Sequence, residues 1–116
     1  MKRKFRLTRS KDIKRVRRSG KSYAHPLIVL IRHPNELATS RFAVAAGKLV
    51  GNAVLRNRAK RQIRAAIRPS LPATSPGWDI IILARKPIRN APFSKIQSAV
   101  HQLMQQADLL KDLDVN

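Results

Sequence analysis

Residues 51–68 read GNAVLRNRAKRQIRAAIR, and this stretch combines a helical apolar period with charge of one sign. Its apolar residues recur at the spacing of one helix face, at Leu55, Ala59, Ile63 and Ala66/Ile67. The opposite face carries cations and amides, and no carboxylate lies between Asn52 and Arg68. The stretch therefore predicts an amphipathic helix with a core-facing stripe, which Pro69 ends.

The charged face of this helix is unfavourable by itself. Six cations follow Asn52, and four of them stand four residues apart, at Arg56, Lys60, Arg64 and Arg68. Each like-charge pair at that spacing costs about 0.2–0.5 kcal/mol, whereas a solvated charged face ordinarily mixes both signs. A face of one sign is better explained by a polyanion that neutralises it.

The whole chain shares this imbalance. It has 116 residues, with 25 Lys and Arg against 6 Asp and Glu and a formal net charge of +19. Charge of this size is evidence about partners rather than about fold. A helix on a membrane surface would set large apolar residues opposite its cations, but the basic N-terminal run offers only Ile13 and Val16. Nucleic acid is therefore the expected partner, and no membrane contact is expected.

Length and composition favour one nucleic-acid-binding domain over residues 1–116. Residues 1–9 are predicted to form a basic arm, mobile when the chain is alone, and residues 108–116 form an acidic tail. The chain has no Cys, which fits a reducing cytoplasm. No apolar run is long enough to span a membrane, and no secretory signal is expected.

The remaining pattern predicts an α/β (two-layer α+β) fold, with one sheet and helices packed on it in the order α-β-β-α-β-α. The clear strands are residues 27–32, 41–46 and 79–84. The last of these is apolar after its first residue, so it is expected to be covered on both faces.

The connecting segments complete this order. Ser10 is expected to cap a first helix that runs to about Arg18 and stops at Gly20. Residues 71–77 predict a loop. Pro92 and Ser94 open a last helix, whose apolar face consists of Ile96, Ala99/Val100, Leu103, Ala107 and Leu110.

No group of residues has the spacing that catalysis by the protein itself would require. The acids are scattered, and three of them lie in the C-terminal tail. His25, His33 and His101 show no metal-ligand spacing, and no phosphate-binding loop occurs. We therefore expect no catalytic residue and no metal ligand in this chain.

The basic helix and its surroundings resemble the bacterial ribonuclease P protein subunit. Residues 56–58, Arg-Asn-Arg, match the signature of that family, with Gly-Asn-Ala-Val before it at residues 51–54 and Lys-Arg-x-Ile-Arg after it at residues 60–64. The first helix start, the turn at residues 47–51 and the strand at residues 79–87 agree in order and spacing. The resemblance spans roughly residues 5 to 105.

The resemblance implies a protein that assists a catalytic RNA in removing the 5′ leader from precursor tRNA. Its partners would be the ribonuclease P RNA subunit and precursor tRNA, with no protein partner implied. Its cofactor would be Mg²⁺, held mainly by the RNA.

For the fold, the resemblance implies a mostly antiparallel sheet of about four strands, like domain 2 of ribosomal protein S5. It also implies a left-handed β-α-β crossover, whereas the general rule for such units is right-handed. A fourth strand is then expected around residues 21–25.

Carried over residue by residue, the resemblance places RNA contacts at Asn52, Arg56, Asn57, Arg58, Lys60, Arg61, Arg64, Arg68 and Lys48. Guanidinium groups suit bidentate phosphate contacts. Two alternatives stay open: Asn52 caps the helix instead, or Arg58 packs its stem along the core edge. Arg85 and Lys86 are expected as peripheral phosphate contacts.

The family also places the single-stranded leader in a cleft between the first helix and the open face of the sheet. Aromatic rings are common there, but the corresponding positions here are Ile13, Arg17 and Ile31. Tyr23 is expected to replace a missing ring in part, while Trp78 is expected to cover the core edge. Leader contact is therefore predicted to depend more on charge and less on stacking.

The alternative is a ribosomal or other structural RNA-binding protein with no role in cleavage. Charge and size fit this alternative equally well. Only the Arg-Asn-Arg motif, together with the sequence features around it, argues against this alternative.

Overall fold

A computed structural model describes residues 1–111 of the chain. Its main elements are α1 (Ser10–Ser19), β1 (Lys21–Ala24), β2 (Ile28–Pro34), β3 (Arg41–Ala46), α2 (Ala53–Ile67), β4 (Trp78–Ala84) and α3 (Phe93–Gln106). The four strands form one sheet in the order β1-β2-β4-β3. β3 and β4 are parallel, and the other neighbours are antiparallel. The predicted α/β class and the expected fourth strand are confirmed.

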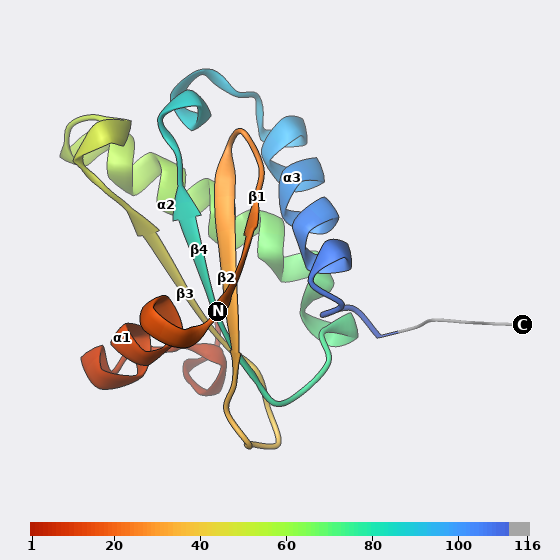
Figure 1. The fold of residues 1–116 in the computed structure, drawn as a ribbon. Helices are drawn as coiled ribbons and strands as arrows, with labels where there is room; N and C mark the ends of the chain where they lie inside the picture. Colours follow the sequence, from red (N-terminus) through yellow and green to blue (C-terminus); the bar gives the residue numbers. More distant parts are fainter. Residues whose placement is uncertain (112–116) are drawn as a thin grey trace, which may run out of the picture.

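The link from β3 through α2 to β4 is left-handed, as the resemblance implied. Figure 1 shows β3 and β4 pointing the same way, with α2 on the far side of the sheet between them. The ordinary expectation of a right-handed crossover is wrong for this chain.

Strand register divides the sheet into two unequal faces. Leu30, Ile82 and Val44 lie across from one another on neighbouring strands and face the main core beneath α2 and α3. One residue along, Ile31 and Ile81 point to the opposite face and pack with Val16 and Leu7 in a smaller cluster beneath α1. The alternation follows from the two-residue period of a strand.

Most predicted boundaries lie within one or two residues of those observed, but four expectations need correction. The last helix, α3, ends at Gln106, so Leu110 does not belong to its apolar face and instead forms a bridge with Thr74. Ser10 does not cap α1: it is the first residue of the helix, and Arg9 stands at the cap position with no side-chain hydrogen bond. Part of the predicted loop at residues 71–77 belongs to a 3-10 segment, η3 (Arg68–Ala73). β2 begins one residue later than predicted and extends to Pro34.

The two chain ends differ from a simple arm and tail. Leu7 is buried, its amide donates to the Phe42 carbonyl at 2.8 Å, and Arg6 forms a bridge with Phe42. The end of the basic arm is therefore attached to the edge of β3, while the mobility of the residues before it stays a prediction. Of the predicted acidic tail, residues 112–116 lie outside the described part of the chain.

Within residues 1–111, no helix is both long and apolar enough to span a membrane.

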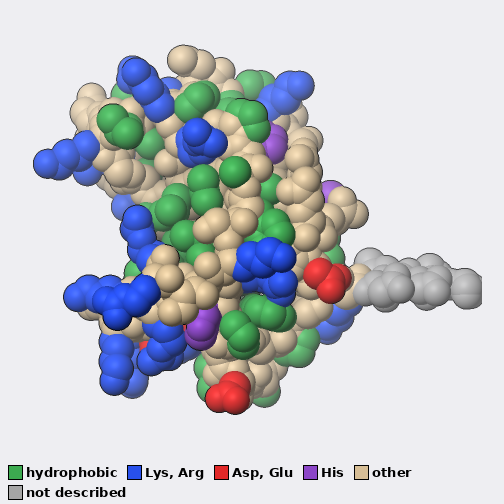
Figure 2. Space-filling model, in the orientation of Figure 1, with side chains coloured by type: hydrophobic (Ala, Val, Ile, Leu, Met, Phe, Trp, Pro, Cys, Tyr) green, Lys and Arg blue, Asp and Glu red, His purple; other side chains and the backbone are tan. Residues whose placement is uncertain are grey.

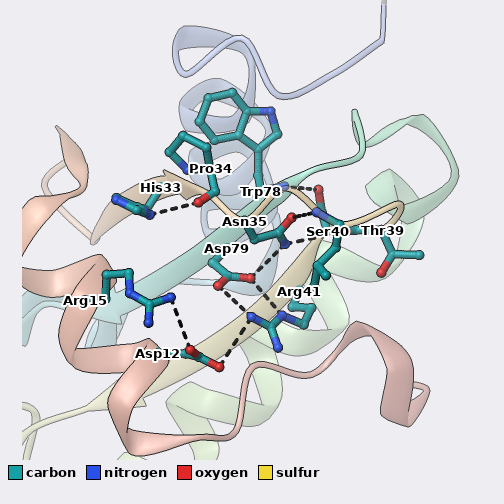
Figure 3. A network of polar contacts seen from close by, with 11 residues as sticks. Asp12, Arg15, His33, Pro34, Asn35, Thr39, Ser40, Arg41, Trp78 and Asp79 are labelled. Carbon is teal, nitrogen blue, oxygen red and sulfur yellow. Dashed lines mark hydrogen bonds and ion pairs between the residues drawn. The ribbon is translucent and has the colours of Figure 1, made fainter.

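An ion pair between β3 and β4 extends to α1 through Asp12 (Figure 3). Arg41 donates from Nε and Nη2 to the two carboxylate oxygens of Asp79, each at 2.8 Å. The same Nη2 reaches Asp12 of α1 at 3.5 Å, and Asn35 donates to Asp79 at 2.9 Å. Asp79 is only 2% exposed, so its charge depends on these partners. The network links α1 to two strands.

The hydrogen bond from Arg41 to Asp79 raises the pKa of the Arg41 guanidinium above its ordinary value. Because the folded-state pKa lies above that of the unfolded chain, the stabilisation from this shift is complete at neutral pH. It is lost only when the pH rises through the folded-state pKa. Arg41 therefore stays charged throughout the physiological range.

Position 20 requires glycine because backbone atoms of α1 and β2 lie very close to it, and not because of its dihedral angles. A Cβ on this residue would lie 2.5 Å from the Val16 carbonyl oxygen and 2.8 Å from that of Arg32. Both atoms are backbone and cannot rotate away. The glycine thus allows the end of α1 to lie directly on β2.

We predict that Gly20→Ala lowers the free energy of unfolding by about 1–3 kcal/mol, because the methyl group overpacks this junction. Gly47→Ala is the matched control: a Cβ there has nothing within 4 Å, and the φ angle of −85° suits alanine. Urea titration of both variants measures the difference. Equal stability of the two variants would contradict the close-approach argument.

We also predict that Arg41→Met lowers the free energy of unfolding by about 3 kcal/mol, since it leaves Asp79 buried and unpaired. Arg15→Met is the control, because Arg15 is half-exposed and pairs with Asp12 at 3.4 Å. Its loss should change stability by less than about 0.5 kcal/mol. Thermal or urea unfolding at neutral pH distinguishes the two, and similar losses would contradict the argument that Asp79 depends on Arg41.

Candidate nucleic-acid interface

The basic face of α2 is positioned by the burial of its apolar stripe. Ala59, Ile63, Ala66 and Ile67 are all buried in the main core, as predicted, while Leu55 is half-buried. The side chains of Asn57, Arg58, Arg61, Arg64 and Arg68 are exposed on the remainder of the helix. The core therefore fixes which way the cations point.

Asn52 is the N-cap of α2. Its side-chain oxygen accepts a hydrogen bond from the Leu55 amide at 3.0 Å, so the capping interpretation is confirmed. Asn52 is also exposed, and a contact with RNA through its amide nitrogen stays a prediction.

The arginine that runs partly along the protein surface is Arg56 rather than Arg58. Arg58 is exposed, whereas Arg56 is half-buried and its Nε is enclosed without a hydrogen-bond partner among the described residues. The guanidinium of Arg56 therefore lies at one flank of α2, on the same side as Lys60 four residues later. The two signature arginines consequently lie on different sides of the helix.

The turns that carry further predicted cations lie at the end of the molecule where α2 begins (Figure 1). Lys48 lies in the turn η2 (Lys48–Val50), which packs against η4 (Lys86–Asn90), the turn that begins with Lys86. Gly51 follows with a φ of +143°, a conformation that L-residues rarely adopt, and lets the chain turn into α2. Arg85 lies beside the β1–β2 hairpin and donates to the His25 carbonyl at 3.3 Å. Lys48 and Lys86 are therefore at one end of the interface, and Arg85 is peripheral to it.

The open face of the sheet lies beside α1. Ile13 packs at the margin of the smaller cluster with Val29, Ala43 and Leu83, all of them partly exposed. Ile31 is buried in the same cluster, and Arg17 is exposed one helical turn after Ile13. The structure thus brings Ile13, Arg17 and Ile31 together around an aliphatic surface.

Tyr23 does not belong to this group, and its predicted place in the cleft is wrong. Its register partner is Leu30, so its ring lies on the opposite face and packs against the main core. Its hydroxyl accepts a hydrogen bond from Arg32 at 3.2 Å. Trp78 packs at the same core margin, as expected, with the Arg32 guanidinium 4.3 Å from its ring centre.

On the face of the molecule drawn in Figure 2, positively charged side chains greatly outnumber acidic ones. Figure 2 shows Lys and Arg side chains over α1 and around the end that carries η2 and η4, with hydrophobic side chains between them and few acidic ones. Asp12 and Asp79 are already paired with arginines, so they do not attract further cations. The potential over this face is therefore strongly positive and suited to a polyanion.

The donor groups of the described residues do not fit a metal site. Within residues 1–111, no three His, Cys, Asp or Glu side chains lie close enough to hold an ion. The carboxylates of Asp12 and Asp79 face guanidinium groups, which occupy the oxygens that Mg²⁺ would need. We derive no chemical step through a metal held by the protein.

Two structural roles were missed by sequence reasoning. The sequence pattern indicates only that Arg41 starts a strand, although its register with Asp79 also places it within reach of Asp12 in α1. The pattern predicts a mobile arm at Arg6, but this residue lines a pocket at the edge of β3 together with Arg64 and Ile13. The apolar Leu7 is the sequence signal that this part of the arm is packed, since a fully solvated arm gains nothing from a large apolar side chain.

Comparison with known proteins agrees with this geometry. The family model described as Ribonuclease P matches residues 1–108. A ribonuclease P protein component of Herpetosiphon aurantiacus is 42% identical over 112 residues, covering 97% of this chain and 91% of the relative. That of Roseiflexus sp. strain RS-1 is 37% identical over 115 residues, covering 98% and 94%.

Solved structures give the same result. The RNase P protein of Staphylococcus aureus matches with a TM-score of 0.84 and 29% identity, over 92% of this chain and 98% of that one. The RNase P protein from Thermotoga maritima, at 24% identity, matches in fold with a TM-score of 0.79 over 87% and 96%. With its basic crossover helix and its sheet of four strands, this chain belongs to the ribonuclease P protein family.

Proposed function

We propose that this chain binds the catalytic RNA of ribonuclease P through the basic face of α2 and the 5′ leader of precursor tRNA through the open face of the sheet. As a member of its family, it is a component of an enzyme that matures tRNA 5′ ends. The observation that carries the proposal is the one-sign face of α2, held outward by a buried apolar stripe.

The α2 face suits a folded RNA better than a protein surface. Its guanidinium groups are preformed donors for phosphate oxygens, and none of those described on α2 pairs with a carboxylate. Each cation that meets a phosphate also releases a counterion, which makes binding strongly dependent on salt. Lys48 and Lys86 would extend the contact beyond the start of the helix.

The open face of the sheet suits a single strand. It offers aliphatic side chains for bases, at Val29 and Leu83, and a cation for the backbone, at Arg17. Aliphatic groups contact a base without stacking on it, so recognition of the leader should tolerate many base sequences.

The remaining parts of the proposal concern the enzyme's setting. Mg²⁺ would be held by RNA phosphates, while this chain supplies positive charge around them. The assembled enzyme would act in the cytoplasm.

Reconstitution tests the α2 interface. A bacterial ribonuclease P RNA is combined with 5′-labelled precursor tRNA at low Mg²⁺, with and without this protein. The protein should promote release of the intact leader, and Arg56→Ala/Arg58→Ala should reduce this by about tenfold or more, since it removes two charge-assisted phosphate contacts.

The matched control removes two exposed cations that lie outside α2, as Lys95→Ala/Lys111→Ala. It should retain the stimulation. A protein that binds the RNA without changing cleavage would support the structural RNA-binding alternative. Cleavage without any RNA subunit would contradict both interpretations.

A second prediction concerns the leader. In the assembled enzyme, Ile13→Ala and Arg17→Ala should each weaken binding of leader-bearing precursor by about three- to tenfold and leave binding of mature tRNA unchanged. Arg18→Ala is the control, because Arg18 lies with Lys14 on the outer side of α1. Unchanged affinity of the first two variants would exclude the open face as the leader site.

A further inference from the structure

A pocket of about 470 Å³ lies at the edge of β3, between the arm and α2. Its apolar floor includes Ile13, Ala43 and Leu7, and cations stand on its rim at Arg6 and Arg64. Its volume falls within the range of small-ligand sites. The pocket joins the two surfaces described above, because Ile13 belongs to the open face and Arg64 to the basic face of α2.

We infer that this pocket binds one unpaired nucleotide of a single-stranded RNA, with its base on the Ile13–Ala43 floor and its phosphate between Arg6 and Arg64. The inference rests on the proposed function and extends it, since the pocket would receive a strand that leaves the open face around the edge of β3.

The cations on the rim are free to bind phosphate. Arg6 donates from Nε to the Met1 carbonyl at 3.1 Å, and both residues line the pocket. Arg64 is exposed, and among the described carboxylates none pairs with Arg6 or Arg64. Two guanidinium groups from separate elements can therefore converge on one phosphate, the geometry that arginine forks favour.

The edge of β3 adds hydrogen-bonding groups for a base. β3 is an edge strand, and its outward Phe42 carbonyl accepts the Leu7 amide. Because backbone groups alternate along a strand, the N–H and C=O of Val44 also point outward, beyond the last residue of the bridged arm. Val44 lines the pocket, so a donor and an acceptor face the ligand there.

The arm itself completes the pocket. Thr8 follows the anchored Leu7 and lines the pocket with an exposed hydroxyl. Phe42 also lines the pocket, but its side chain is only 3% exposed and offers no open ring for stacking. A base there would be recognised by aliphatic groups, a strand edge and a hydroxyl.

The test uses the full chain, a fluorescent single-stranded oligouridylate, and two matched pairs of variants. Arg6→Gln should weaken binding about five- to tenfold, whereas Arg3→Gln, an equal loss of charge on the same arm outside the pocket, should change it less than about twofold. Thr8→Glu should weaken binding to a similar extent, because it puts a carboxylate beside the phosphate. Ser94→Glu, exposed at the start of α3, should not.

Photocrosslinking gives a second measurement that does not depend on affinity. A thiouridine in the probe should crosslink to peptides containing residues 6–8 or 43–44. Equal losses for Arg6→Gln and Arg3→Gln, or crosslinks confined to other peptides, would overturn the inference.

Reconstituted cleavage separates this inference from the proposed function. If Arg56→Ala/Arg58→Ala abolishes stimulation while the two pocket variants bind the probe like their controls, only the pocket fails. If the α2 variant also leaves cleavage unchanged, the proposed function fails with it.

Discussion

Burial of the apolar stripe of α2 is the interaction on which the rest of the structure depends. Ile63 and Ile67 are fully buried, and burial of such side chains contributes about 1.5–3 kcal/mol each. The three like-charge i,i+4 pairs from Arg56 to Arg68 cost about 0.2–0.5 kcal/mol each. Packing therefore outweighs repulsion, and the helix can hold an unneutralised cationic face. The left-handed crossover sets this face beside the edge of β3.

The two sides of the sheet have different uses. The α2–α3 side is a complete hydrophobic core, whereas the α1 side buries only a small cluster and relies on the Asp12–Arg41–Asp79 network. A single short helix cannot cover a sheet of four strands. The uncovered part is the open face next to Ile13, so the limited packing of α1 is what leaves room for a ligand.

Most helices and strands were predictable from their apolar periodicity, whereas the fourth strand and the crossover were expected only from the family resemblance. The α2 stripe and the strand at residues 41–46 follow directly from their apolar spacing, and the structure confirms both. The side of Tyr23 was not predictable, because β1 is short and its register with β2 depends on a hairpin with no sequence pattern of its own. The role of Arg41 was also hidden, since only the parallel register places it opposite Asp79. The left-handedness of the β3-α2-β4 crossover was expected only from the family resemblance, because the residue pattern does not specify it.

The composition of the open face has a consequence for recognition. Aliphatic side chains attract bases by contact area alone, which distinguishes poorly between one base and another, whereas stacked rings contribute about 1–3 kcal/mol per base. With Tyr23 on the other face, the proposed binding of a single strand would draw more of its free energy from phosphate contacts at cations such as Arg17. Such binding is sensitive to salt and tolerant of sequence. These are the properties that an enzyme needs when it processes many precursors whose leaders differ.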